Sequence, residues 1–216
     1  MAITFVRQAV GSSSASTTCS VTITAPTAGN CLVACVYSDS GAVTGITGGG
    51  VTWAVLKASA FAHFDSEIWF GLNSSGAAGP IVVTYGASGN NAVNVSEFSG
   101  IKTSAAADVT TSTNGVSAVP SSGALTASAG PALHLASMSI NSNGETGPGG
   151  GFTALTDASN SFRHALGAYQ IATSPAALTC SWTEAVTYDM AYGVLLGTVA
   201  TSTSRDPFGL MGFFGV

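Results

Sequence analysis

The sequence predicts an all-β fold: a single antiparallel β-sandwich of jelly-roll type with about a dozen short strands. Three observations predict it. Helical periodicity is nearly absent, alternation of polar and apolar residues recurs along the chain, and clusters of Gly, Pro, Asn and Ser interrupt that alternation. Short strands separated by such turns are typical of sandwiches.

The segment from Thr18 to Ala25 gives the clearest strand signal. Successive side chains of a strand point to opposite faces, so its hydroxyl residues and its apolar residues would separate. One face would carry Thr18, Ser20, Thr22 and Thr24, and the other Cys19, Val21, Ile23 and Ala25. We therefore expect one wet and one dry face here.

Similar stretches predict the remaining strands. In the first half they fall at residues 2–9, 30–38, 51–59, 64–72, 80–86 and 91–99, and in the second at 117–126, 132–140, 163–172, 177–184 and 187–199. The predicted turns are at 25–30, 47–50, 74–76, 88–90 and 141–151. Together they give one sandwich domain over residues 1–200.

Residues 201–216, TSTSRDPFGLMGFFGV, break this pattern. Apolar anchors alternate there with glycines, which let an extended strand approach a partner closely. The anchors are Phe208, Leu210, Met211, Phe213, Phe214 and Val216. We predict a docking tail that binds the sheet edge of a neighbouring subunit; the alternative is a tail that folds back on its own core.

The composition excludes several classes of protein. Only 7% of the residues are charged, against about 25% in an ordinary domain, whereas 46% are hydrophobic, which excludes intrinsic disorder. A net charge of −5 without a Lys/Arg cluster argues against nucleic-acid binding. The longest apolar run, 191–200, is too short to span a membrane as a helix.

The start of the chain and its scarcity of charge suggest where the protein works. The segment MAITFVRQAV does not resemble a signal peptide, because Arg7 interrupts its apolar part, so we expect assembly in a cytoplasm. A surface rich in Ser, Thr, Gly and Ala lacks the charges that normally prevent edge-to-edge pairing of strands. We therefore expect a homo-oligomer or a component of a larger assembly.

The four cysteines are expected to be buried free thiols. All lie in predicted strands, and Cys31 and Cys35 are four residues apart, too far for a disulfide along one strand. No pair has zinc-knuckle spacing. Cys19 and Cys180 complete the set, and one cross-strand disulfide stays open as an alternative.

Residues that could support catalysis or bind metal are few. His63, Asp65 and Glu67 would share one strand face, but the outer pair is too far apart to bind one ion without a bend, so a hydrated outer face is expected. His134 is expected in a core or interface, and the pair Arg163-His164 at the surface or in an interface.

The acidic residues Asp39, Glu97, Asp108 and Asp157 are interpreted as turn or loop-end residues. Nucleophile elbow, Walker, dinucleotide-binding, zinc-protease and EF-hand motifs do not occur in the sequence. We expect no enzyme, no cofactor and no metal; an enzyme would have to use His63 or His134.

Aromatic residues leave a second function open. Trp53, Trp69 and Trp182 could stack on sugars, as in carbohydrate-binding sandwiches, together with Tyr85, Tyr169, Tyr188 and Tyr192. The competing interpretation is core packing, because Trp69 lies in the apolar run Ile68-Trp69-Phe70.

The order of several short motifs resembles a known group of domains. The motifs are Ala2-Ile3-Thr4-Phe5-Val6, residues 25–34 (APTAGNCLVA), Val51-Thr52-Trp53, residues 68–73 (IWFGLN), residues 81–85 (IVVTY) and residues 95–101 (VSEFSGI). They resemble jelly-roll-like β-sandwich domains of tailed-bacteriophage virion proteins, which also occur in bacterial surface proteins. The resemblance covers about residues 1–200 and supplies no catalytic residues.

What the resemblance implies is a structural role. We expect a virion protein, most specifically a capsid decoration (cement) protein that clamps capsid subunits, as a homo-oligomer such as a trimer in contact with the major capsid protein. A tail or fibre component, or a carbohydrate-binding adhesion module, is the alternative.

Overall fold

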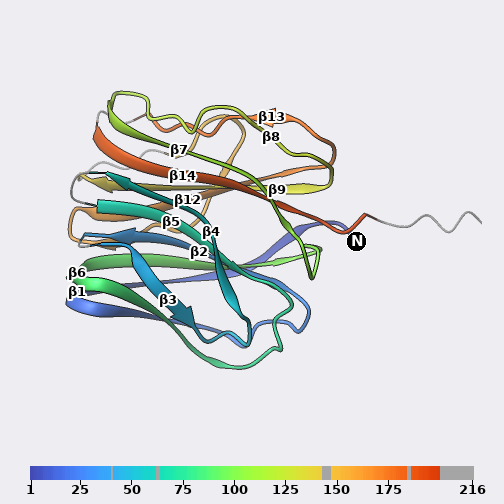
Figure 1. The fold of residues 1–216 in the computed structure, drawn as a ribbon, viewed down its shortest axis with the longest axis horizontal. Coiled ribbons are helices and arrows are strands. Elements are labelled where there is room, and N and C mark those ends of the chain that lie inside the picture. Colours follow the sequence, from blue (N-terminus) through green and yellow to red (C-terminus); the bar gives the residue numbers. More distant parts are fainter. Residues whose placement is uncertain (40, 62–63, 143–146, 184–185, 200–216) are drawn as a thin grey trace, which may run out of the picture.

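The computed structural model describes residues 1–39, 41–61, 64–142, 147–183 and 186–199. These residues form fourteen β-strands and no helix, and every strand pair is antiparallel. Two large sheets pack against each other (Figure 1). The all-β sandwich predicted from the sequence is therefore confirmed.

Each sheet is built from one half of the chain. The N-terminal sheet has the order β1(Thr4–Ile23), β6(Gly79–Ser99), β2(Cys31–Ser38), β5(Phe64–Gly71) and β4(Trp53–Phe61), with β3(Val43–Thr47) also paired to β6. The C-terminal sheet has the order β10(Thr153–Ala154), β12(Arg163–Ala172), β9(Ala132–Asn141), β14(Val186–Leu196) and β7(Ala107–Ser117), with β11(Ala158–Asn160) also paired to β12. A short pair, β8(Leu125–Thr126) and β13(Ala177–Leu178), stands apart.

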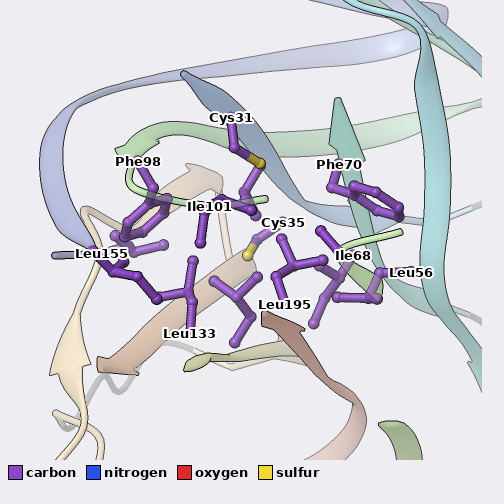
Figure 2. Packing of buried hydrophobic residues seen from close by; sticks show 14 of the residues in the cluster. Cys31, Cys35, Leu56, Ile68, Phe70, Phe98, Ile101, Leu133, Leu155 and Leu195 are labelled. Carbon is purple, nitrogen blue, oxygen red and sulfur yellow. The ribbon is translucent and has the colours of Figure 1, made fainter. Parts of the chain in front are cut away.

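Both central strands, β2 and β9, are buried on both faces. Their inner faces meet across the sandwich, where Val33, Cys35, Leu133 and Leu135 share one core with Phe98 and Phe70. Figure 2 shows Phe98 and Phe70 at opposite sides of this cluster. Because apolar burial drives folding, this core is the main source of sheet-to-sheet adhesion.

A flap covers the outer face of each sheet. The flap over the N-terminal sheet consists of the second part of β1, the first part of β6, and β3. Its residues Val21, Ile81 and Ile46 pack in one cluster with Leu32 and Val36 of β2. Over the C-terminal sheet, the flap includes Cys180 and Trp182 and covers Met138 and Ile140 of β9. Four layers result, with β3 and β8/β13 on opposite sides in Figure 1.

Several predicted boundaries change because strands run through predicted turns. The predicted strands 2–9 and 18–25 belong to one long strand, β1, and 80–86 and 91–99 belong to β6, so the turn predicted at 88–90 is wrong. The strand predicted at 117–126 is wrong over most of its length, since β7 ends at Ser117 and β8 contains only Leu125 and Thr126. The alternation in β1 is confirmed: Cys19, Val21 and Ile23 are buried, but Ala25 is exposed.

The two sheets have the same topology. If β1, β2, β4, β5 and β6 are matched with β7, β9, β10/β11, β12 and β14, the order of one sheet reproduces the order of the other. Each of these contacts between the sheets has a counterpart in which the two units exchange roles. The contact of β5 with β9 corresponds to that of β2 with β12, and the contact of β5 with β14 corresponds to that of β6 with β12. In the same way, the contact of β4 with β7 corresponds to that of β1 with β11. This is the contact pattern of two like units packed face to face.

Details of register support this internal repeat. The β1–β6 ladder shifts register between Arg7 and Phe5, and the β7–β14 ladder shifts at the matching step, between Gly193 and Leu195. The sequence GGGVT at 48–52 recurs as GGGFT at 149–153. We call residues 4–100 and 107–197 the two repeats.

Candidate functional site

The most unusual polar site lies between the sheets, around Asp189 of β14. Its carboxylate is fully buried and accepts hydrogen bonds from the Ser59 hydroxyl and from the Ser66 backbone N–H, the latter at 2.9 Å. The Ser66 hydroxyl in turn donates to the Ser137 carbonyl at 2.9 Å. Burial raises the pKa of Asp189 to about 6.

Asp189 is not among the candidate residues indicated by the sequence patterns. The available signal was a lone acid inside an apolar strand, Tyr188-Asp189-Met190, which is rare because a buried carboxylate must be paired. Strands β4, β5, β9 and β14 meet at this site, so its hydrogen bonds join one sheet to the other.

Glu67 is also buried, on the opposite face of β5. It accepts hydrogen bonds from the Val43 N–H at 2.7 Å and the Trp69 indole N–H at 2.6 Å, and burial raises its pKa. The hydrated face predicted for His63, Asp65 and Glu67 is therefore wrong at Glu67, because the flap covers it. Asp65 is half-buried, and His63 lies outside the described residues.

Glu97 corrects another prediction. It is a fully buried strand residue of β6, not a loop-end residue. Its carboxylate faces Arg7 Nε at 2.9 Å and accepts hydrogen bonds from Thr27 N–H at 2.9 Å and Asn30 Nδ2 at 2.6 Å. The charge therefore fixes the loop between β1 and β2.

His134 lies in the core, as predicted. Its Nδ1 is 2.7 Å from the Tyr192 hydroxyl, which donates to the Leu178 carbonyl at 3.1 Å. Since the single hydroxyl proton of Tyr192 is used there, Nδ1 carries the imidazole proton and donates it. Burial lowers the pKa of His134 to about 4, so the ring is neutral at pH 7.

The pair Arg163-His164 divides between two environments. Arg163 forms an ion pair with Asp39 at 2.8 Å and is half-buried. His164 is buried, with Nδ1 2.8 Å from Asp157 Oδ2, so the surface or interface position predicted for it is wrong. Asp108 accepts a hydrogen bond from the Ser128 N–H at 2.7 Å.

All four cysteines are buried and unpaired as thiols, which confirms the prediction and excludes the alternative disulfide. Burial raises the pKa of Cys19 to about 11 and those of Cys31 and Cys35 to about 12. These thiols behave as small apolar groups.

The three tryptophans are not gathered on one open face. Trp182 is 2% exposed and belongs to the core beneath the C-terminal flap. Trp53 and Trp69 are half-buried and pack against the core beneath the other flap, and Trp53 donates its indole N–H to the Gly48 carbonyl. Tyr85, Tyr188 and Tyr192 are buried, and the half-buried Tyr169 stacks on Phe5. Sugar stacking thus has few exposed rings among the described residues.

The described residues contain neither a metal-binding cluster nor a membrane-spanning helix. No three His, Cys, Asp or Glu side chains there gather in a way that could hold a metal ion. No helix in that part of the chain is long and apolar enough to cross a bilayer. The tail anchors from Phe208 to Val216 lie outside the described residues.

Comparison with protein-family models, with curated proteins and with solved structures finds no match to this chain.

Proposed function

We propose that this protein is a non-enzymatic structural subunit that works by being covered by its neighbours. In its specific form, the proposal is a virion protein of a tailed bacteriophage, most specifically a capsid decoration (cement) protein. The observation that carries this proposal is that several of the few charged side chains are buried or paired within the protein. Glu67, Glu97 and Asp189 are buried, and Asp39 is paired with Arg163, so much of the charge of a charge-poor chain is used inside.

The outermost strands support the same role. Within the described residues, β1 pairs only with β6, and β7 pairs only with β14, so each leaves one edge free. From Gln8 to Ile23 in β1, and from Val109 to Ser117 in β7, the sequence has no charged residue. Uncharged free edges are templates for strand pairing with another chain.

The partners in this proposal are other copies of the chain and the major capsid protein. The phage-specific part rests on the sequence resemblance, and the subunit role rests on the edges and the buried charge. Many weak contacts on a lattice add through high effective concentration, so no single contact has to be strong.

Sedimentation analysis over a wide range of protein concentration tests the subunit role. The intact chain is expected to associate, and Val10→Lys in β1 or Thr110→Lys in β7, both at exposed positions, should weaken association. Ala78→Lys, at an exposed residue outside the strands, is the matched control. An intact chain that stays monomeric at every concentration would overturn the proposal.

A further inference from the structure

A groove lined mainly by apolar side chains and glycines lies where β4 begins. It has a volume of about 760 Å³, and its lining includes Phe70, Leu72 and Ala54 together with Gly48 and Gly50. Its walls carry no charged side chain. Phe70 and Leu72 belong to the inner core or pack against it, so the groove opens onto one end of the sandwich core.

The other repeat has an aromatic ring at the position that matches this groove. Phe70 pairs with Val33 of β2, and Tyr169 pairs with Leu135 of β9, at the same step of the two repeats. Tyr169 is covered by an aromatic ring: Phe5 stacks on it with ring centroids 5.5 Å apart, and Phe98 meets it edge-on at 5.3 Å.

The corresponding ring is missing over Phe70. Phe5 pairs with Phe98 just after the register shift in the first repeat, and Ala107 pairs with Leu195 just after the matching shift in the second. Ala107 therefore takes the place of Phe5, and it is exposed. One end of the core is closed by a phenylalanine, and the other is left open beside Phe70.

We propose that the groove beside Phe70 receives a phenylalanine ring from the C-terminal segment of a second copy of the chain. This deepens the proposed function and rests on it, since it requires subunits in contact. The segment carries Phe208, Phe213 and Phe214, each next to a glycine or another phenylalanine, and has no charged side chain after Asp206. Glycine beside a ring lets the backbone of the segment approach the groove closely.

The point where the segment starts agrees with this occupant. Leu196 donates its N–H to the Ala106 carbonyl at 2.7 Å, so the end of β14 lies beside the start of β7. Residues 200–216 extended would span roughly 55 Å, enough to reach an adjacent subunit. The same reach permits docking within one chain, so the experiment must separate the two arrangements.

Disulfide cross-linking of the full chain provides the test. A variant with Thr52→Cys, at an exposed groove residue, is mixed with a variant with Leu210→Cys, and both are oxidised mildly. The native thiols are buried and should not interfere. We expect a cross-linked dimer of the two variants, and about tenfold less of it when Val116→Cys, at the exposed end of β7, replaces Thr52→Cys.

The double variant in one chain identifies the source of the segment. A product of two chains supports the proposal, whereas a link formed only within one chain, or no link, overturns it. As a second measure, Ala54→Phe should fill the groove and lower the cross-link about tenfold, and Ala60→Phe on the same strand should not. If Ala54→Phe leaves association of the chains unchanged and only Val10→Lys or Thr110→Lys weakens it, this inference fails while the subunit role stands.

Discussion

Asp189 of β14 and Ala92 of β6 occupy matching positions in the two repeats, and both are fully buried. Cys35 and Ser137 mark the matching centres of β2 and β9. Two residues further on, Tyr37 pairs with Ala92 in one repeat, and Ser139 pairs with Asp189 in the other. The fold therefore accepts a methyl group where it also holds a carboxylic acid.

The neighbours of these two residues differ in the same way. Around Ala92 lie Ala158 and Ala165, in an apolar cluster with Tyr37. The matching neighbours of Asp189 are Ser59 and Ser66, which hydrogen-bond to it. The polar site around Asp189 therefore occurs in only one of the two matching contacts between the sheets. The apolar cluster at Ala92 shows that such a contact forms without a buried acid.

Replacing Asp189→Asn should change how stability depends on pH. The folded-state pKa of Asp189, about 6, lies above its ordinary value of 3.8, so its contribution favours folding at low pH and is lost as pH rises through 6. Asp65 and Glu67 add negative charge nearby. The variant should be more stable than the wild type above pH 7 by about 2–3 kcal/mol and should lack this slope.

Urea unfolding at several pH values measures the effect of Asp189→Asn. Asp108→Asn, on the edge strand β7, controls for loss of one acid elsewhere. Equal slopes for the wild type and the Asp189→Asn variant between pH 4 and 7 would contradict the assignment of a raised pKa.

His134→Leu should remove the opposite pH dependence. The folded-state pKa of His134 is lowered from 6.5 to about 4, so its contribution is fully present above pH 6.5 and is lost as pH falls towards 4. Leucine already stands at the matching position, Leu32, and fits a buried site. The variant should lose about 1 kcal/mol at pH 7, from the bond to Tyr192, yet lose less than the wild type on acidification.

The slopes from His134 and Asp189 have opposite signs between pH 4 and 6.5 and partly cancel in the wild type. Differences between variants, measured by thermal unfolding at matched pH, are therefore the informative quantity. A His134→Leu variant with the same acid sensitivity as the wild type would show that another group controls it.

Local sequence patterns predicted the class of fold but not which faces would be covered. The alternation in residues 18–25 separated Cys19 from Ser20 correctly, because a strand exposed on one side leaves a period of two. The predictions failed at Glu67, which alternation placed on a hydrated face, and at Glu97, which was interpreted as a turn or loop-end residue. Their burial depends on a flap and on a loop partner, which are contacts between residues distant in sequence.

The repeat itself left a trace that could have been found. GGGVT and GGGFT stand at matching turns. The matching pairs Gly49 and Gly150, and Gly50 and Gly151, all have positive φ, a conformation that favours glycine. Comparison of the halves would have predicted two sheets of one topology. It would not have located the groove beside Phe70, because that depends on the difference between Phe5 and Ala107.

Glu97→Ala should destabilise the protein by about 3 kcal/mol, since it leaves Arg7 and the loop groups of Thr27 and Asn30 without their acceptor. Asp39→Ala is the matched control. It removes the partner of Arg163 in a pair whose side chains are about one-fifth exposed, so about 1 kcal/mol is expected. Urea midpoints measure both, and equal losses would argue that burial of Glu97 adds nothing.

Thiol reactivity tests the packing of both flaps and of the core between the sheets. Cys31 and Cys35 lie in the inner core, whereas Cys19 belongs to the N-terminal flap and Cys180 to the C-terminal flap. A buried thiol with a raised pKa is neither accessible nor ionised at pH 8, so the native protein should not react with an aromatic disulfide reagent. All four should react in denaturant.

Slow reaction of Cys180 before Cys35 under native conditions would mean that the C-terminal flap opens more readily than the sandwich. Rapid reaction of Cys35 in the folded protein would contradict the inner core described above.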